Sequence, residues 1–213
     1  MTPEDSARLG SQTVHVWVVP LDDPSKQRQH ELAHAAQDRI LAAYLEIEPE
    51  DLEYGTLPGG KPVLADGSLE FNISHSGALA LVAVSRDLQV GVDLEHPRDF
   101  KNEAGMAQRI CCARELEHLA SATEADELLR LWVRKEAVVK ATGEGLGNGL
   151  VTRVKALDVL DRKVAGGWLC LDLPYVGAEG VDAEGYRAAV ALPDRPRVSV
   201  ALRTFSREAV LRH

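Results

Sequence analysis

Residues 90–95 have the sequence VGVDLE, and residues 132–143 have the sequence WVRKEAVVKATG. The first stretch is an apolar run typical of a strand, so Asp93 and Glu95, two residues apart, leave it on the same face. Like charges that lie so close repel each other, and a buried carboxylate without a partner is costly. We therefore expect a cation to compensate this pair, unless the two residues lie at a solvated strand end.

The second stretch places Glu136 and Lys140 four residues apart in a predicted helix, so they share a face with Trp132. One interpretation is a favourable surface pair, which at this spacing is worth about 0.2–0.5 kcal/mol. The other is that Glu136 adds a third carboxylate to a cation site while Lys140 binds a phosphate. The helix alone fits both interpretations.

Two further stretches carry polar groups into turns. Residues 71–77, FNISHSG, bring Ser74 and His75 from a strand into a turn that ends at glycine, and these groups are suited to phosphate oxygens. Residues 58–64, PGGKPVL, place Lys61 in a loop whose glycines expose the backbone. Each stretch also fits an ordinary turn. A serine hydrolase is excluded because the Gly-x-Ser-x-Gly signature is absent around Ser74.

The composition limits the class of partner. The chain has 213 residues, of which 33 are acidic and 24 are basic, and a formal net charge of -9. The electrostatic field of a negatively charged protein disfavours the binding of nucleic acid. A phosphate-bearing ligand therefore needs a local cluster of basic residues. Three cysteines without metal-ligand spacing favour a reducing, cytoplasmic environment. We expect neither an export signal nor membrane insertion, since no apolar run approaches the ~20 residues that span a bilayer.

Hydrophobic periodicity predicts the order of the elements. Strands are expected at residues 13–19, 71–74, 78–85, 89–95, 154–160, 168–173, 186–192 and 198–205. Helices are expected at residues 29–45, 103–120 and 124–142, the second of them as one bent helix or two. Residues 54–68 are expected to form a loop, and residues 78–85 and 89–95 a hairpin.

This order divides the chain at His96-Pro97 into two parts of similar content. We predict an α+β fold of two pseudo-duplicated halves, residues 1–96 and 97–213, that form one compact unit. The two halves show no self-similarity at the level of residues. The duplication is therefore inferred from the order of the elements alone.

Taken together and in this order, GGKP, FNISHSG, VGVDLE and WVRKEAVVKATGEGL resemble the motifs of the 4′-phosphopantetheinyl transferases, in their larger surfactin-synthetase-activator type. The motifs extend from residue 59 to residue 146. The resemblance implies an active site in the cleft between two pseudo-symmetric halves. It also implies a Mg²⁺-dependent, monomeric enzyme that transfers the phosphopantetheine arm of coenzyme A to a serine of an apo acyl or peptidyl carrier protein and releases adenosine 3′,5′-bisphosphate.

The resemblance also assigns roles to the acidic residues. By position, Asp93, Glu95 and Glu136 correspond to the metal ligands, and Lys140 corresponds to the cation on the pyrophosphate. Glu115, in ICCARELEHL, aligns with a glutamate proposed as the general base of the family. The alternatives are that Glu115 is a carboxylate on the surface of a helix and that a metal-bound water takes the serine proton.

For coenzyme A, the resemblance places Ser74, His75 and Arg39 at the 3′-phosphate. It also places Lys61 and Pro62 in the loop that borders the adenine. Two other functions stay open: a Mg²⁺-dependent hydrolase of coenzyme A or nucleotide pyrophosphates, and a non-catalytic module that binds coenzyme A or a carrier protein. The presence of all three carboxylates and of the lysine argues against the non-catalytic module.

Overall fold

The computed structural model describes residues 9–21, 23–96, 100–124, 126–144, 150–174, 176–178, 180–181 and 183–206. The helices are α2 (Lys26–Leu45), α3 (Glu103–Ile110), α4 (Ala113–Ser121), α5 (Glu127–Thr142) and α6 (Leu150–Ala156), with a 3₁₀ turn at Pro49–Asp51. The strands are β1 (Thr13–Pro20), β2 (Tyr54–Thr56), β3 (Pro62–Leu64), β4 (Glu70–Ser76), β5 (Leu79–Ser85), β6 (Gly91–Glu95), β7 (Lys163–Val164), β8 (Trp168–Asp172), β9 (Arg187–Pro193) and β10 (Ser199–Thr204). The predicted α+β class is confirmed.

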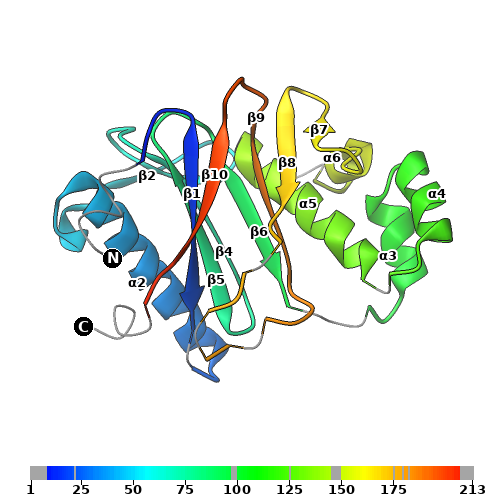
Figure 1. Ribbon diagram of the computed structural model, residues 1–213, viewed down its shortest axis with the longest axis horizontal. Helices are drawn as coiled ribbons and strands as arrows, with labels where there is room; N and C mark the ends of the chain where they lie inside the picture. The colour runs from blue at the N-terminus through cyan, green and yellow to red at the C-terminus, as the bar shows by residue number, and fades with distance from the viewer. Residues whose placement is uncertain are drawn as a thin grey trace.

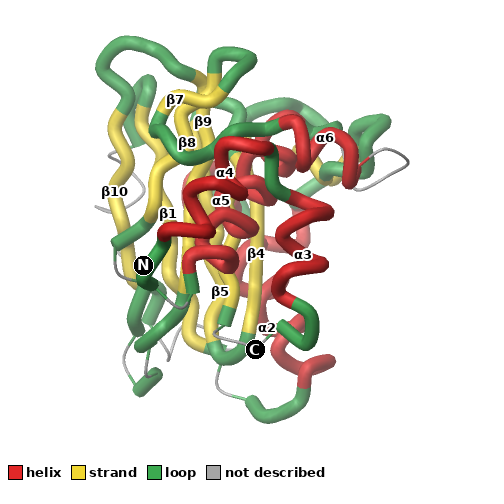
Figure 2. The backbone as a smooth tube through the Cα atoms, turned by 90° about the vertical axis from the view of Figure 1, so that its right-hand side faces the viewer, coloured by secondary structure: helices red, strands yellow, loops and turns green. Residues whose placement is uncertain are grey.

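Two four-stranded sheets carry the structure (Figure 1). The first sheet has the strand order β10-β1-β5-β4, the second has the order β6-β9-β8-β7, and β2 and β3 form a small separate pair. Helix α2 packs on the first sheet and α5 on the second, so the helices and the strands gather in separate layers (Figure 2). β4 and β6 are each an edge strand of their sheet, and they lie next to each other where the two sheets meet.

Alternation of side chains along the strands builds three apolar clusters. The valines at even positions of β1 enter a cluster shared by both sheets, whereas Trp17 and Val19 pack against α2. In β9, Ala189 and Ala191 face α5. Asp93 of β6 is paired with Ala189 in the ladder, so its side chain also leaves the sheet toward α5. The register of one strand pair thus decides which face carries the carboxylates.

Most of the predicted helices and strands are confirmed, but two segments differ from their predicted secondary structure. Residues 54–68 are not all loop, because β2 and β3 lie there and pair with each other. Residues 154–160 do not form a strand, because α6 continues to Ala156. The β-branched Val154 is buried in that helix, where its carbonyl accepts a hydrogen bond from Lys135, so tertiary packing overrides local propensity. The segment 103–120 forms two helices, α3 and α4.

The predicted hairpin of β5 and β6 is also wrong. β5 pairs with β1 and β4, whereas β6 pairs with β9 in the other sheet. In the opposite direction, β10 returns from the end of the chain to pair with β1 in parallel. Strand pairing therefore crosses the expected boundary at residue 96 twice. The division into two halves stays a prediction, and residues 97–99 lie outside the described residues.

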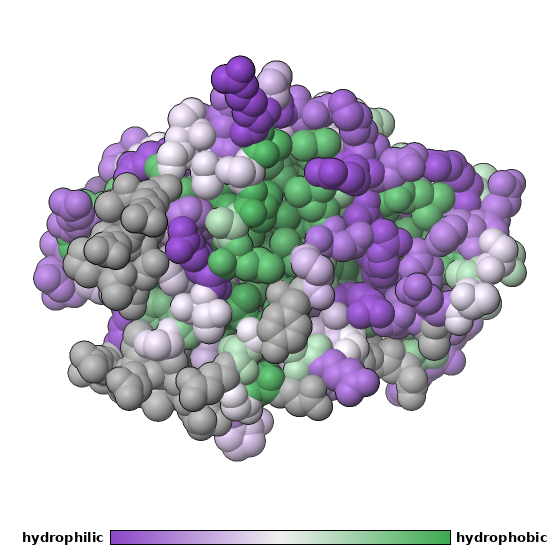
Figure 3. Space-filling model, in the orientation of Figure 1, coloured by the Kyte–Doolittle hydropathy of each residue, from purple (hydrophilic) through white to green (hydrophobic). Residues whose placement is uncertain are grey.

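The face seen in Figure 3 carries an apolar region. Figure 3 shows apolar side chains in the middle of the face that carries the strands, with polar side chains around them. They lie over the strands that enclose the cluster shared by both sheets. None of the helices in the described part of the chain combines the length and the apolar character needed to cross a bilayer.

Candidate active site

A row of three polar side chains on β4 connects the two sheets. Asn72 Oδ1, Ser74 Oγ and Ser76 Oγ accept hydrogen bonds from the backbone N–H groups of Val92, Leu94 and His96, at 2.8, 3.3 and 3.0 Å respectively. These side chains act as the partner that the free edge of β6 otherwise lacks. The FNISHSG motif therefore holds the second sheet in register against the first.

Asp93 and Glu95 lie beside this row. Ser74 Oγ donates to Asp93 Oδ1 at 2.8 Å, and Ser76 Oγ donates to Glu95 Oε2 at 3.0 Å. Asp93 is buried, with 5% of its surface exposed, and Glu95 is half-buried. Both carboxylates lie on the same side of β6, as their spacing predicts.

A glycine allows α5 to approach these carboxylates. A Cβ atom on Gly91 would overlap the backbone of Ala137 and Ala141 in α5. Only glycine therefore permits the helix to pass this close to β6. The approach brings Glu136, which is buried, and Lys140, which is half-buried, to the acidic face of the strand.

The buried carboxylates are short of partners. Lys140 Nζ lies 2.7 Å from Asp93 Oδ1 and 3.0 Å from Ser74 Oγ. Asp93 Oδ2 and Glu136 Oε1 are buried and accept no hydrogen bond. An unpaired carboxylate oxygen in such a place is costly. Two buried oxygens without partners, on carboxylates that repel each other, are suited to a hard cation, which prefers oxygen ligands.

The electrostatics of Glu136 agree with this. Burial, and then the negative charge of Asp93, raise the pKa of Glu136 to about 7; Lys140 acts in the opposite direction and Glu95 adds to the increase. Burial and the two neighbouring carboxylates together therefore outweigh the effect of Lys140. A divalent cation would favour the charged form of Glu136.

Glu115 lies elsewhere, in a buried ion pair. Its side chain is fully buried, 2.7 Å from Lys135 Nζ, and accepts hydrogen bonds from the backbone N–H groups of Cys112 at 2.9 Å and Val159 at 3.0 Å. Lys135 precedes Glu136 on α5, and successive helical side chains point about 100° apart. The structure does not bring Glu115 to the other carboxylates, and the alternative of a carboxylate on the helix surface is wrong.

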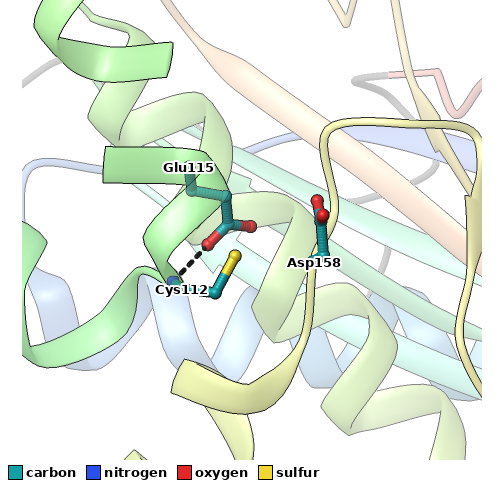
Figure 4. A group of neighbouring side chains, drawn as sticks. All are labelled: Cys112, Glu115 and Asp158. Atoms are coloured by element: carbon teal, nitrogen blue, oxygen red, sulfur yellow. Dashed lines mark hydrogen bonds between the residues drawn. The ribbon is translucent and has the colours of Figure 1, made fainter. Parts of the chain in front are cut away.

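Figure 4 shows Glu115 next to Cys112 and Asp158. Among the described residues, these form the group of three whose potential metal-ligating atoms lie within 4.8 Å of one another. Both acidic side chains already have a basic partner, because Glu115 pairs with Lys135, and Asp158 lies 2.8 Å from Arg114. We interpret this group as structural. The carboxylates on β6 and α5 are less tightly grouped, and they contain the oxygens without partners.

Ser74 and His75 leave β4 in opposite directions. Ser74 faces Asp93, whereas His75 Nε2 lies 3.2 Å from Nδ1 of His30 on α2. The ring of His34, one turn further along α2, has its centroid 4.4 Å from that of His30. The sequence analysis missed His30 and His34, although a spacing of four residues in a predicted helix puts them on one face. A phosphate-binding role for Ser74 stays a prediction.

Arg39 lies on the same helix and is half-buried. It is five residues beyond His34, which corresponds to about 140° around the helix. The two side chains therefore leave α2 on different faces. A role of Arg39 at the 3′-phosphate stays a prediction.

Lys61 turns its ammonium group into the protein. Its Nζ donates to the carbonyl oxygen of Val90 at 2.9 Å and to that of Ala141, at the end of α5, at 3.5 Å, and the residue is only 8% exposed. Burial lowers the pKa of Lys61, an effect that Glu70 opposes. Lys61 is also one of the residues that line a pocket of about 340 Å³, which are Gly59, Gly60, Lys61, Pro62, Asn72, Val139, Lys140 and Gly143.

Comparison with known proteins identifies the family. Residues 89–191 match the model of the 4′-phosphopantetheinyl transferase superfamily. The 4′-phosphopantetheinyl transferase HetI of Nostoc sp. is 34% identical over 170 residues, which cover 65% of this chain and 72% of that protein. The chain belongs to the 4′-phosphopantetheinyl transferase superfamily. The phosphopantetheinyl transferase Sfp of Bacillus subtilis is 28% identical over 169 residues, which cover 74% of this chain and 71% of that protein.

Other phosphopantetheinyl transferases match over a shorter region. The human L-aminoadipate-semialdehyde dehydrogenase-phosphopantetheinyl transferase is 32% identical over 125 residues, 51% of this chain and 40% of that protein. The part that matches the family model includes β6 and α5, and thus all three carboxylates and Lys140. It does not include α2, which carries His30 and His34.

Proposed function

We propose that this chain transfers the 4′-phosphopantetheine arm of coenzyme A to a serine hydroxyl of an apo acyl or peptidyl carrier protein and releases adenosine 3′,5′-bisphosphate. Membership of the superfamily supports the class of reaction. The observation that carries the proposal for this chain is the pair of buried carboxylate oxygens without partners, on Asp93 and Glu136. They lie where Lys140 provides a fixed cation beside them.

Mg²⁺ fits the residues at this place. Asp93, Glu95 and Glu136 offer only oxygen ligands, and one or two carboxylates are enough for a Mg²⁺ ion that also binds phosphate oxygens. The raised pKa of Glu136 supports a site that lacks positive charge. When bound, the cation would withdraw charge from the pyrophosphate of coenzyme A and stabilise the leaving group.

Lys140 supplies a second, fixed positive charge. In the reaction the serine oxygen forms a bond to the β-phosphorus while the bond from that phosphorus to the leaving bisphosphate breaks. Negative charge increases on the leaving oxygen, so an ammonium group held in place by Asp93 and Ser74 stabilises the transition state more than the ground state. Lys140 is therefore proposed as a catalytic residue.

Glu115 as the acceptor of the serine proton stays a prediction. Its carboxylate is bound by Lys135 and by two backbone N–H groups, so it would have to leave this pair before it could meet a substrate. The full burial of both partners argues against that movement.

We place the nucleotide of coenzyme A along the pocket beside Lys140. Glycines at positions 59 and 60, together with Lys61 and Pro62, give the pocket a wall of exposed backbone and aliphatic stem that suits a flat base. Because Lys140 lines the same pocket, a ligand bound there would extend its phosphates toward the carboxylates.

We further propose that the site belongs to the junction of two related halves. Each sheet has four strands, and each carries one long helix on the same side. The metal ligands come from β6 and α5, which lie on the two sides of the expected boundary. This arrangement supports one chain forming the whole site as a monomer.

Mass spectrometry of apo carrier proteins tests the function. Incubation with this chain, coenzyme A and Mg²⁺ should add the mass of one phosphopantetheine group to the carrier. Release of adenosine 3′,5′-bisphosphate without any carrier would indicate a pyrophosphate hydrolase instead. Binding of coenzyme A with neither transfer nor hydrolysis, on several acyl and peptidyl carriers, would support a non-catalytic module.

A further inference from the structure

The two serines of β4 repeat one arrangement two residues apart. Ser74 Oγ donates to Asp93 Oδ1 at 2.8 Å, and Ser76 Oγ donates to Glu95 Oε2 at 3.0 Å. Each hydroxyl also accepts a hydrogen bond from the backbone N–H of the residue that follows its carboxylate, at 3.3 and 3.0 Å respectively. A carboxylate only accepts and a backbone N–H only donates, so the direction of these hydrogen bonds is fixed. Each serine therefore links one carboxylate to the backbone of β6.

Alternation along the two strands produces this repeat. Residues two apart on a strand face the same way, so Ser74 and Ser76 lie on one side of β4, and Asp93 and Glu95 lie on one side of β6. The two strands belong to different sheets, and serine side chains connect β4 to the backbone of β6. The register of β4 against β6 thus assigns one hydroxyl to each carboxylate.

The turn after β4 holds Ser76 in place. The next residue, Gly77, has a φ of 58°, and a Cβ atom there would overlap Tyr186 Oη and lie 2.9 Å from the ring of His96. Tyr186 Oη accepts a hydrogen bond from the backbone N–H of Ala78 at 3.0 Å, and its ring centroid lies 4.9 Å from that of His96. The turn is therefore packed against the start of β9 and the end of β6, and it presents the hydroxyl of Ser76 from a fixed position.

The two carboxylates differ in how much conformational freedom they lose when a cation binds. Asp93 is buried, and Lys140 Nζ lies 2.7 Å from its Oδ1. Glu95 is half-buried, and the side chain of glutamate has one more rotatable bond than that of aspartate. Holding Glu95 in a single orientation therefore costs more entropy. A hydrogen bond that fixes one of its oxygens in the free protein reduces the entropy lost on binding.

We propose that Ser76 is a positioning residue: its hydroxyl holds Glu95 in the orientation that a divalent cation requires, and so increases the affinity of the site for that cation. This inference rests on the proposed function, in which Asp93, Glu95 and Glu136 hold Mg²⁺. Ser76 acts through Glu95 and touches neither the cation nor the substrate. Groups that hydrogen-bond to metal ligands in this way typically contribute about 10–100-fold to metal affinity.

Ser76 is a better position for an experiment than Ser74. The hydroxyl of Ser74 also accepts a hydrogen bond from Lys140 Nζ at 3.0 Å, so a change there disturbs the lysine as well as Asp93. The hydrogen bonds of Ser76 involve Glu95 and the backbone. Its substitution therefore tests the orientation of one carboxylate.

Electron paramagnetic resonance of Mn²⁺ measures the affinity of the site without catalysis. Mn²⁺ shares the preference of Mg²⁺ for carboxylate oxygens, and the signal of the free ion decreases as the ion binds. Titration of the protein without coenzyme A or a carrier gives the Kd. Ser76→Ala should raise this Kd about 10–100-fold. Ser76→Thr keeps the hydroxyl and suits a strand, so its Kd should stay close to that of the wild type.

The matched control is Ser85→Ala, which removes a serine from the neighbouring strand β5. Ser85 is fully buried, and its hydroxyl donates to the backbone carbonyl oxygen of Thr13 at 2.8 Å. The loss of this hydrogen bond should lower the Tm and leave the Kd for Mn²⁺ unchanged. Thermal denaturation of each variant confirms that the titrated protein is folded.

A double-variant cycle separates positioning from a structural effect. In a Glu95→Ala background, Ser76→Ala should have no further effect on the Kd for Mn²⁺, because the carboxylate on which Ser76 acts is gone. A purely structural role of Ser76 would instead weaken binding by the same factor in both backgrounds.

An unchanged Kd in Ser76→Ala would overturn the inference, as would equal effects of Ser76→Ala with and without Glu95, or no Mn²⁺ binding by the wild type. Transfer to apo carrier proteins by the wild type is measured separately, at saturating Mg²⁺ and coenzyme A. If the wild type transfers the arm but Ser76→Ala binds Mn²⁺ as the wild type does, only this inference fails. If Ser76→Ala weakens Mn²⁺ binding but the wild type transfers nothing, only the proposed function fails.

Discussion

Lys140 Nζ lies 2.7 Å from Asp93 Oδ1, and this ion pair joins α5 to β6 where the two sheets meet. The side chain of Asp93 is 7% exposed and that of Lys140 is 24% exposed, so the pair is mostly buried and solvent reaches it from the side of Lys140. The second oxygen of Asp93 has no partner. Asp93 therefore has one oxygen for the lysine and one available for a cation.

Replacing Asp93→Asn should remove most of the activity without unfolding the protein. The amide keeps the shape of the carboxylate but loses the ion pair and the charged metal ligand. Loss of one preorganised charged group in an active site typically lowers kcat by about 100–1,000-fold. Transfer rates measured by mass spectrometry at saturating coenzyme A and Mg²⁺ check this. Asp66→Asn, at an exposed aspartate that accepts only a local hydrogen bond from Ser68, is the matched control. Near-normal turnover of Asp93→Asn would contradict the assignment.

The metal-free protein should lose stability as the pH rises toward neutral because of Glu136. Its pKa is about 7 in the folded chain against an ordinary value of 4.5. The contribution of Glu136 to the free energy of unfolding is therefore fully present below about pH 4.5 and is lost as the pH rises through 7. The loss is about 2 kcal/mol after an allowance for partial exposure. Urea unfolding in the presence of a chelator, at pH 5 and pH 8, measures the change.

Glu136→Gln should remove this part of the pH dependence and make the metal-free protein more stable than the wild type at pH 8. Glu117→Gln, at an exposed position of α4, should keep the wild-type slope and serves as the control. If Glu136→Gln and the wild type lost the same free energy of unfolding between the two pH values, the raised pKa of Glu136 would be disproved.

Spacing within a single element predicted correctly which of these side chains share a face. Two residues along a strand return to the same face, which gave the common side of Asp93 and Glu95. Four residues along a helix return to the same face, which gave the common side of Glu136 and Lys140. The side chains of the motif FNISHSG alternate between the two faces of β4. Ser74 therefore faces β6 and His75 faces α2, a separation that the sequence analysis did not predict.

The contacts between distant segments were beyond prediction from local patterns. β5 and β6 are separated by a short polar turn that is typical of a hairpin, yet β6 pairs with β9, almost one hundred residues later. The buried ion pair of Glu115 was not predicted, because its partner, Lys135, lies on a different helix. In each case the stabilising contact is made with a residue or strand that lies in another part of the sequence.

Gly91→Ala should displace α5 and reduce both stability and activity. The added methyl group would overlap the backbone of Ala137 and Ala141, which cannot move as a flexible side chain does. Overpacking of this kind typically costs about 1–3 kcal/mol. The displaced helix carries Lys140, so turnover should fall more than the folded fraction does. Thermal denaturation and transfer rates measure the two effects.

The control for this variant is Gly55→Ala. A Cβ atom at Gly55 would meet only a side-chain carbon of Val63 at 3.5 Å, which is ordinary contact. It should therefore be close to neutral in stability and activity. If Gly91→Ala were as active and as stable as Gly55→Ala, the close approach of α5 to β6 would not be what positions the site.

Glu115→Gln should destabilise the protein and change the chemistry little. Glu115 and Lys135 are both fully buried, and the ammonium group also donates to the carbonyl oxygens of Val154 and Leu157. Removing the negative charge leaves a buried cation uncompensated, which typically costs about 3–5 kcal/mol. The double variant Glu115→Gln, Lys135→Met should recover part of this loss, because no buried charge remains. Urea unfolding of the wild type, both single variants and the double variant gives the coupling free energy.

The same variants decide whether Glu115 accepts the serine proton. If its role is to hold α4 against α5, turnover per folded molecule of Glu115→Gln should fall less than about tenfold, since general-base catalysis alone contributes 100–10,000-fold. The rate should also keep the wild-type dependence on pH. A larger loss of turnover, together with the disappearance of the acidic limb of the pH profile, would instead support Glu115 as the general base. It would then require that the pair with Lys135 opens when the carrier protein binds.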